Sequence, residues 1–193
     1  MSQSKVTKIL LDANVLYPAP IRDLLLNIAC QGYYYPQWSG DIHREWSTNL
    51  LKNRPDIKPR QLERTILLMN EVFPGANVRN YKKLIAQLDL PDSNDRHVLA
   101  AAIKSDSKYI ITFNTKDFPS KELDKYEITC KHPDDYILNV GMSDFEVLKE
   151  ATELQLSALI NPKISLSQLI DNFNRCGLEK SADFLLRSLS EIV

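Results

Sequence analysis

Short apolar runs alternate with amphipathic segments over the first two thirds of the chain, and this alternation restricts the fold more than any other feature. Strand-like runs lie at residues 6–11, 33–35, 108–112 and 128–130. Strands that are separated by helical segments are typical of a parallel sheet. We therefore predict an α/β fold of three layers, in which helices cover both faces of a central parallel sheet.

Punctuating residues place the helices between these strands. Pro20 and Gly32 bracket one amphipathic helix, Ser39 can cap a second, and Pro59 can open a third. After about Gly141 the strand signal disappears, and three helical patterns follow. We expect an α/β domain over residues 1–140 and a helical extension over residues 141–193.

The composition excludes several classes of protein. The chain has 193 residues, with 24 Lys and Arg against 25 Asp and Glu, so no field of one sign covers it. Three single cysteines fit neither a disulfide framework nor a CxxC metal pair. No glycine pattern of a dinucleotide or P-loop site occurs. The apolar stretch before Asp12 is too short for a signal peptide or a membrane span, so we expect a soluble, cytoplasmic protein.

Four acids lie at the ends of predicted elements. Asp12 ends the first strand, and Asp117 closes the loop after the strand "YIIT". Asp95 begins the helix "DRHVLAAA", and Glu45 borders the apolar face of the helix "DIHREW". The carboxyl ends of parallel strands open at one edge of the sheet, and a helix that runs back toward its strand begins there too. We therefore expect the four carboxylates to converge.

Convergence of carboxylates points to a divalent cation. Two carboxylates about 4 Å apart repel by roughly 4 kcal/mol at an effective dielectric constant near 20. Oxygen-only ligation favours Mg²⁺ or Mn²⁺, and such ions support cleavage of phosphodiester bonds. Each acid also has an ordinary explanation, because Asp12, Asp95 and Asp117 could cap turns or helices and Glu45 could form a surface ion pair. The four taken together favour the metal site.

The segments around these acids resemble the PIN-domain family of metal-dependent ribonucleases. The resemblance is carried by "ILLDANVL", "HREW", "DRHVLAAA" and above all "YIITFNTKDFP", and it spans roughly residues 5 to 136. It implies that Asp12, Glu45, Asp95 and Asp117 surround Mg²⁺ or Mn²⁺. Asp92 is a competing candidate, because "DSND" offers two acids.

The resemblance also implies supporting residues, a substrate and a partner. Asn14, Thr112 and Asn114 would support the site or contact the substrate, which in such families is RNA. The implied activity is that of an endoribonuclease of the VapC-like toxin type, inhibited by an antitoxin protein. The helical tail departs from the short toxin pattern, and its apolar helices would also suit a homodimer.

Basic and aromatic side chains near the acids are candidates for substrate binding. Arg96 and Lys116 flank two of the acids and could hold phosphates, as could other basic residues near the acidic segments; these are Arg44, Lys52, Arg54, Lys58, Arg60 and Lys121. Tyr17, Trp38 and Trp46 could stack on bases, although the helical spacing of Trp46 from Ile42 is more often that of a core residue. The alternative function is a non-catalytic module that binds RNA or protein on the same fold. A phosphatase with an aspartyl nucleophile is disfavoured, because "DAN" lacks the second Asp of a DxD site.

Overall fold

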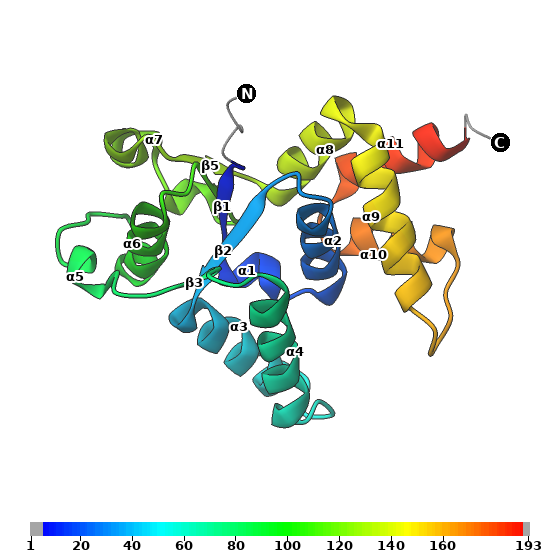
Figure 1. Cartoon of the computed structure of the whole chain (residues 1–193), viewed down its shortest axis with the longest axis horizontal. Helices are drawn as coiled ribbons and strands as arrows, with labels where there is room; N and C mark the ends of the chain where they lie inside the picture. Colours follow the sequence, from blue (N-terminus) through cyan, green and yellow to red (C-terminus); the bar gives the residue numbers. More distant parts are fainter. Residues whose placement is uncertain (1–5, 191–193) are drawn as a thin grey trace. The chain divides into compact units, whose positions relative to one another are not determined.

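The computed structural model describes residues 6–190, and these contain a five-stranded parallel sheet (Figure 1). The strands are β1 (Lys8–Leu11), β2 (Tyr35–Ser39), β3 (Asn77–Val78), β4 (Tyr109–Ile111) and β5 (Thr129–Lys131). Their order across the sheet is β3-β2-β1-β4-β5, and every neighbouring pair is parallel. From β1, the chain adds β2 and β3 on one side of the sheet and then β4 and β5 on the other. The strand order therefore reverses beside β1, which makes this position a topological switch point.

The register of the two central strands determines where the polar residues after them lie. Leu11 pairs with Ile111, and both side chains are fully buried. The next backbone amide, that of Asp12, donates to the carbonyl oxygen of Ile111 at 3.1 Å. Asp12 and Thr112 therefore leave the sheet side by side at its carboxyl edge.

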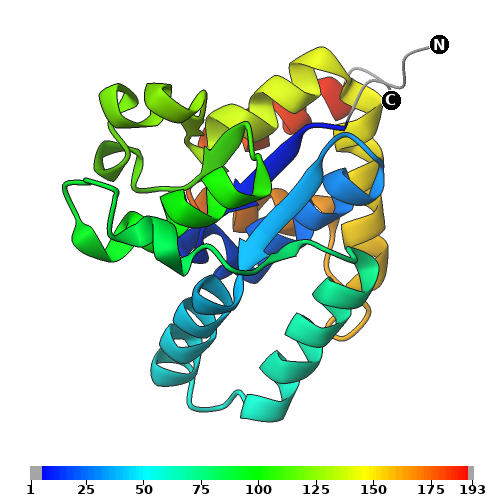
Figure 2. The same cartoon turned by 60° about the vertical axis from the view of Figure 1, so that its left-hand side comes forward.

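Within the described residues, the chain divides into two compact units, of which the first comprises residues 6–17 and 34–131 and holds the whole sheet. Its α-helices are α1 (Ala13–Leu16), α3 (Gly40–Asn53), α4 (Pro59–Val72), α5 (Lys82–Ile85), α6 (Arg96–Ser105) and α7 (Ser120–Leu123). Short 3-10 helices lie at η1 (Ser93–Asp95), η2 (Thr115–Asp117) and η3 (Asp124–Tyr126). Figure 2 shows α3 and α4 as a pair of helices beyond the end of β2.

Two features of this unit agree with the sequence patterns. The run Ala100, Ala101 and Ala102 in α6 is fully buried, and α6 contacts four of the five strands. Small side chains let the helix backbone approach the sheet closely. Ser39 caps α3 by accepting a hydrogen bond from the Ile42 amide at 3.2 Å, as predicted.

The second unit comprises residues 18–33 and 132–190 and consists of helices. They are α2 (Ala19–Cys30), α8 (Pro133–Ser143), α9 (Phe145–Ala158), α10 (Leu166–Arg175) and α11 (Glu179–Ser190). Helix α2 packs on α9, and α8 packs on both α9 and α11. A Cβ atom at Gly141 of α8 would lie 2.6 Å from side-chain atoms of Leu148 and Phe184, so these helices meet closely.

The predicted fold class is confirmed: an α/β fold with a central parallel sheet and additional helices after the last strand. The strand expected at residues 33–35 lies instead at Tyr35–Ser39, and helix α8 was not predicted. None of the helices in the described part of the chain is long and apolar enough to cross a membrane. The domain boundary near residue 140 stays a prediction.

Candidate functional site

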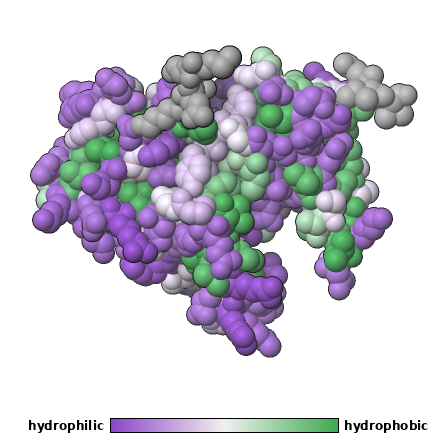
Figure 3. All heavy atoms as spheres, viewed as in Figure 1, coloured by the Kyte–Doolittle hydropathy of each residue, from purple (hydrophilic) through white to green (hydrophobic). Residues whose placement is uncertain are grey.

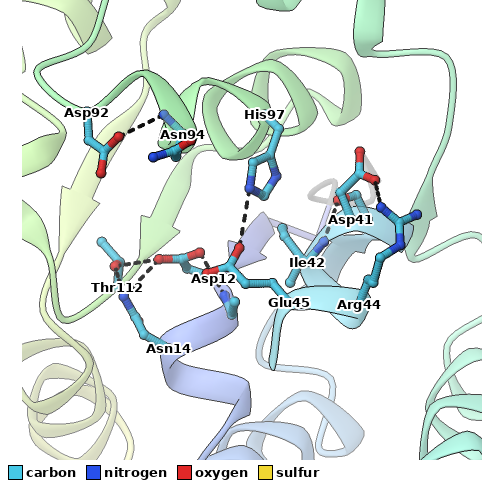
Figure 4. A network of polar contacts seen from close by, with 12 residues as sticks. Asp12, Asn14, Asp41, Ile42, Arg44, Glu45, Asp92, Asn94, His97 and Thr112 are labelled. Atoms are coloured by element: carbon cyan, nitrogen blue, oxygen red, sulfur yellow. Dashed lines mark hydrogen bonds and ion pairs between the residues drawn. The ribbon is translucent and has the colours of Figure 1, made fainter. Parts of the chain in front are cut away.

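Asp12 is the most deeply buried acid at the carboxyl edge of the sheet, with 4% of its surface exposed. One carboxylate oxygen accepts a hydrogen bond from the Ala13 amide at 2.7 Å. The other accepts from the Asn14 side-chain amide at 2.9 Å and from the Thr112 hydroxyl at 2.7 Å (Figure 4). Both oxygens of Asp12 are therefore fixed by groups that directly follow the two central strands.

Asn14 and Thr112 also connect the loops that follow these strands. The Asn14 amide group donates to the Thr112 hydroxyl oxygen at 2.7 Å, and its carbonyl oxygen accepts from the Phe113 amide at 3.1 Å. The Thr112 oxygen accepts a further bond from the Asn114 amide at 3.1 Å. The network holds Asp12 in one orientation, which is the supporting position predicted for Asn14 and Thr112. Their role in function stays a prediction.

Burial disfavours the ionised form of Asp12. It raises the pKa of this carboxyl from 3.8 to about 6, and the nearby charge of Glu45 acts in the same direction. Hydrogen bonds from Thr112 and Ala13 oppose the rise, because they stabilise the carboxylate. At neutral pH the residue is thus a carboxylate in a surrounding that favours a bound cation.

Asp95 lies where the other acids gather. It ends η1, directly before α6, and is half-buried. Burial, followed by the charges of neighbouring carboxylates, raises its pKa to about 6. In decreasing order of influence, these carboxylates are Asp12, Asp92, Asp117 and Glu45. Acids from four separate segments of the chain therefore lie within electrostatic reach of one side chain.

Glu45 and His97 form an ion pair that the sequence did not indicate. The Glu45 carboxylate lies 3.4 Å from His97 Nε2, across the space between α3 and α6 (Figure 4). Burial lowers the pKa of His97, but the hydrogen bond and charge of Glu45, with the charges of Asp12 and Asp41, outweigh it and leave the pKa raised. The other ring nitrogen, Nδ1, is buried and has no hydrogen-bond partner among the described residues. His97 thus holds Glu45 toward Asp12.

The remaining predicted residues lie around this cluster without a shared contact. Asp92 is exposed and caps η1 by accepting from the Asn94 amide at 2.8 Å. The Arg96 guanidinium lies 3.2 Å from the exposed carboxylate of Asp89. Lys116, in η2 beside Asp117, is exposed. The possible metal contact of Asp92 and the substrate contacts of Arg96 and Lys116 stay predictions.

The structure decides between the two explanations for the tryptophans. Trp38 and Trp46 are 0% and 1% exposed, so they belong to the core and cannot stack on a bound strand. The Trp46 indole donates to His43 Nδ1 at 3.0 Å. The stacking interpretation was wrong because an aromatic side chain at helical spacing looks the same in sequence whether its helix faces solvent or the core.

The donor set fits a hard divalent cation by chemistry and charge. All candidate ligands are carboxylates, and burial, together with repulsion between neighbouring carboxylates, raises the pKa values of Asp12 and Asp95. Within residues 6–190, however, no three Asp, Glu, His or Cys side chains lie in the arrangement of a preformed metal site. Asp12 is engaged by three donors and Glu45 by His97. Among the described residues, Asp12 Oδ1 accepts only one hydrogen bond and His97 contacts only one Glu45 oxygen, so both carboxylates keep lone pairs that could bind an ion.

Comparison with known proteins matches the same part of the chain. The PIN domain family model matches residues 8–116. Among curated proteins, the chain is 36% identical over 95 residues to "Putative ribonuclease VapC50" of Mycobacterium tuberculosis. This stretch is 47% of the chain and 53% of that protein, so the chain spans about half the length of the curated relative it matches. No solved structure gives a significant match.

Proposed function

The chain belongs to the PIN domain family, and we propose that it is a metal-dependent endoribonuclease that hydrolyses RNA phosphodiester bonds. The observation that carries the proposal is the gathering of Asp12, Asp92, Asp117 and Glu45 around Asp95 at the carboxyl edge of the sheet. Ionised carboxylates are held together against their repulsion, which is unfavourable for stability and is typical of functional sites. The similarity to a protein named as a ribonuclease supports RNA as the substrate.

Asp12, Glu45, Asp95 and Asp117 would hold Mg²⁺ or Mn²⁺, with Asp92 as a competing ligand. A bound ion of this kind supplies an activated water and neutralises the charge that develops on the phosphate oxygens. The supporting residues act on the protein side. Asn14 and Thr112 fix the orientation of the Asp12 carboxylate, with Asn114 bonded to Thr112, and His97 fixes Glu45.

Two cations beside the acids, the exposed Lys116 and the half-buried Arg96, would position the substrate. Lys116 follows the strand β4 and lies next to Asp117, and Arg96 directly follows Asp95. A phosphate that approaches the acid cluster would meet these positive charges first, and its binding would offset the repulsion between RNA and carboxylates. Both residues would contribute affinity for any RNA sequence, because phosphate contacts do not read bases.

We also propose that the protein is the toxin of a toxin-antitoxin pair in the cytoplasm. The resemblance to VapC-like proteins supports this role, which requires an antitoxin protein as partner, and a homodimer is compatible with it. Induced expression should then arrest growth, and co-expression of a neighbouring small protein should restore it. Unimpaired growth at high expression of the active nuclease would contradict the toxin role while leaving the nuclease activity in place.

Cleavage of a labelled single-stranded RNA in Mn²⁺ tests the nuclease. Asp12→Asn and Asp117→Asn should each abolish cleavage, because each removes a proposed metal ligand. Asp171→Asn is the matched control, since Asp171 is an exposed acid of α10, outside the unit that holds the sheet. Equal cleavage by all four proteins would show that the activity comes from a contaminant or from another site.

A non-catalytic module that binds RNA or protein is the second candidate. It is favoured by the hydrogen bonds that occupy both Asp12 oxygens and by the lack of a preformed metal arrangement within residues 6–190. This function predicts binding without turnover. It also predicts that Mn²⁺ leaves both the melting temperature and the amount of intact RNA unchanged.

A further inference from the structure

A pocket of about 730 Å³ lies on the unit that contains the sheet, at the carboxyl ends of β2 and β3. Its walls are the first turn of α3 and the segment that leads from β3 into α5. Its volume is within the range of about 300 to 1,000 Å³ that is typical of ligand sites. Of the residues predicted to hold phosphates, Arg44 lines it, and none of the candidate metal ligands does.

The pocket concentrates positive charge in a chain whose net charge is −1. Four cationic side chains and one acid line it, which gives a local charge of +3; they are Arg44, Arg79, Lys82, Lys83 and Asp41. Arg79 and Lys83 are exposed, and neither forms an ion pair within residues 6–190. A polyanion can therefore bind these two groups without breaking an existing salt bridge.

Asp41 organises the wall of the pocket. It accepts hydrogen bonds from the Tyr81 hydroxyl and from the Arg44 guanidinium, the latter at 2.7 Å, and Lys82 Nζ lies 3.7 Å away. The Tyr81 bond, assisted by the two cations, keeps the pKa of Asp41 below its usual value. The single negative charge of the lining is thus already shared among three partners, and it repels a bound anion only weakly.

The pocket adjoins the acid cluster through helix α3. Asp41 and Glu45 are one helical turn apart on α3, and the charges of both raise the pKa of His97. Figure 4 shows Asp41 and Arg44 on the same helix as Glu45, on the side away from Asp12. An RNA strand that reaches the acids from this side would pass over the pocket.

The lining selects for phosphate rather than for bases. The one aromatic side chain in it, Tyr81, is only 4% exposed, and its hydroxyl is engaged by Asp41. No aromatic face is therefore presented to a base, whereas cationic groups surround the opening. Such contacts supply affinity that depends on salt and not on sequence.

We propose that this pocket binds backbone phosphates of a single-stranded RNA segment next to the bond that is cleaved. The inference rests on the proposed nuclease function and adds to it a substrate subsite formed by Arg79, Lys82 and Lys83. The pocket fixes where the strand lies relative to the acids and leaves the choice of sequence to other contacts.

The test measures binding of a fluorescent single-stranded RNA to the full chain in EDTA, where the proposed nuclease cannot turn over. The double variant Lys82→Gln/Lys83→Gln should bind about 10- to 30-fold more weakly at 0.1 M salt, and the salt slope of log K should fall by about 1.4. The matched control is Lys104→Gln/Lys108→Gln, because both lysines are exposed and lie near the amino end of β4, at the opposite edge of the sheet. Arg79→Gln should act in the same direction.

The outcomes separate this inference from the nuclease proposal. If wild-type protein cleaves RNA in Mn²⁺ but the pocket variant binds as tightly as the control variant, the subsite is refuted and the nuclease stands. If wild-type protein neither binds nor cleaves RNA, both proposals fail. Polyglutamate and unlabelled RNA are also compared as competitors, with both concentrations expressed as negative charges. If less polyglutamate than RNA displaces the labelled strand, the subsite is refuted and an acidic protein partner is indicated. Equal melting temperatures of the variants show that folding is unaffected.

Discussion

Asp12→Asn should stabilise the folded chain at neutral pH although it removes a proposed metal ligand. Burial raises the pKa of Asp12 from 3.8 to about 6, so at about 1.36 kcal/mol per pKa unit its ionised form costs the folded state about 3 kcal/mol at pH 7. Asn avoids this cost, but only one of its end atoms accepts hydrogen bonds, whereas Asp12 accepts from Ala13 with one oxygen and from Asn14 and Thr112 with the other. Losing one such bond costs about 1 to 2 kcal/mol. The expected net gain is about 1 to 2 kcal/mol.

The gain should depend on pH, because the pKa of Asp12 is higher in the folded than in the unfolded chain. The folded state holds the proton more tightly, so this contribution to stability is fully present below about pH 3.8 and is lost as the pH rises through about 6. About 1.4 kcal/mol of it is lost between pH 5 and pH 7.5. The advantage of Asp12→Asn over wild type should therefore be smaller at pH 5 by that amount.

Urea unfolding in EDTA provides the measurement, since Trp38 and Trp46 are buried and their fluorescence should change on unfolding. At each pH we compare the free energies of unfolding of the two proteins. Their difference largely cancels the contribution of ionisable groups that both proteins contain. Asp171→Asn should show no such dependence on pH. An advantage of Asp12→Asn that stays constant from pH 7.5 to pH 5, or grows toward pH 5, would refute the assignment of a raised pKa to Asp12.

Three further perturbations test other parts of the structure. Thr112→Val removes the donor to Asp12 at 2.7 Å and should lower the free energy of unfolding by about 1.5 to 3 kcal/mol, whereas Thr112→Ser should retain most of it in the same urea assay. Gly141→Ala places a methyl group 2.6 Å from side-chain atoms of Leu148 and Phe184 and should lower the free energy of unfolding by about 1 to 2 kcal/mol. An unchanged free energy of unfolding in urea would mean that both side chains can move aside without cost. Mn²⁺ at about 100 times its dissociation constant should add about 2.7 kcal/mol of stability, and an unchanged melting temperature relative to EDTA would contradict the metal site.

The sequence predicted the strands whose residues alone favour a strand, and it misplaced one that depends on its neighbours. β1 and β4 are runs of buried aliphatic residues, a pattern that is readable without the fold. β2 contains Pro36, Gln37 and Ser39, which are uncommon in strands, and yet all three are buried. The strand forms because it pairs with β1 and β3 on either side, and this information lies far away in the chain.

The candidate site shows the same division between local and distant information. The four acids were predicted to converge because strand ends and helix starts meet at one edge of a parallel sheet, and their charges do act on one another in the structure. The pair of Glu45 with His97 was not predicted. It depends on the relative rotation of α3 and α6, which no spacing along either helix reveals. Of the cations in the basic pocket only Arg44 was predicted to hold phosphates, since the two walls of the pocket come from residues 40–44 and 77–83.

The bond between Thr112 and Asp12 joins residues 100 positions apart, and this separation has a consequence for synthesis. During translation, the first strand is made long before the partner that completes its polar end. A nascent chain that has not yet released residues 109–117 from the ribosome holds Asp12 without Thr112 and lacks Asp117 altogether. Any activity that needs all four acids therefore has to wait until residue 117 has left the ribosome.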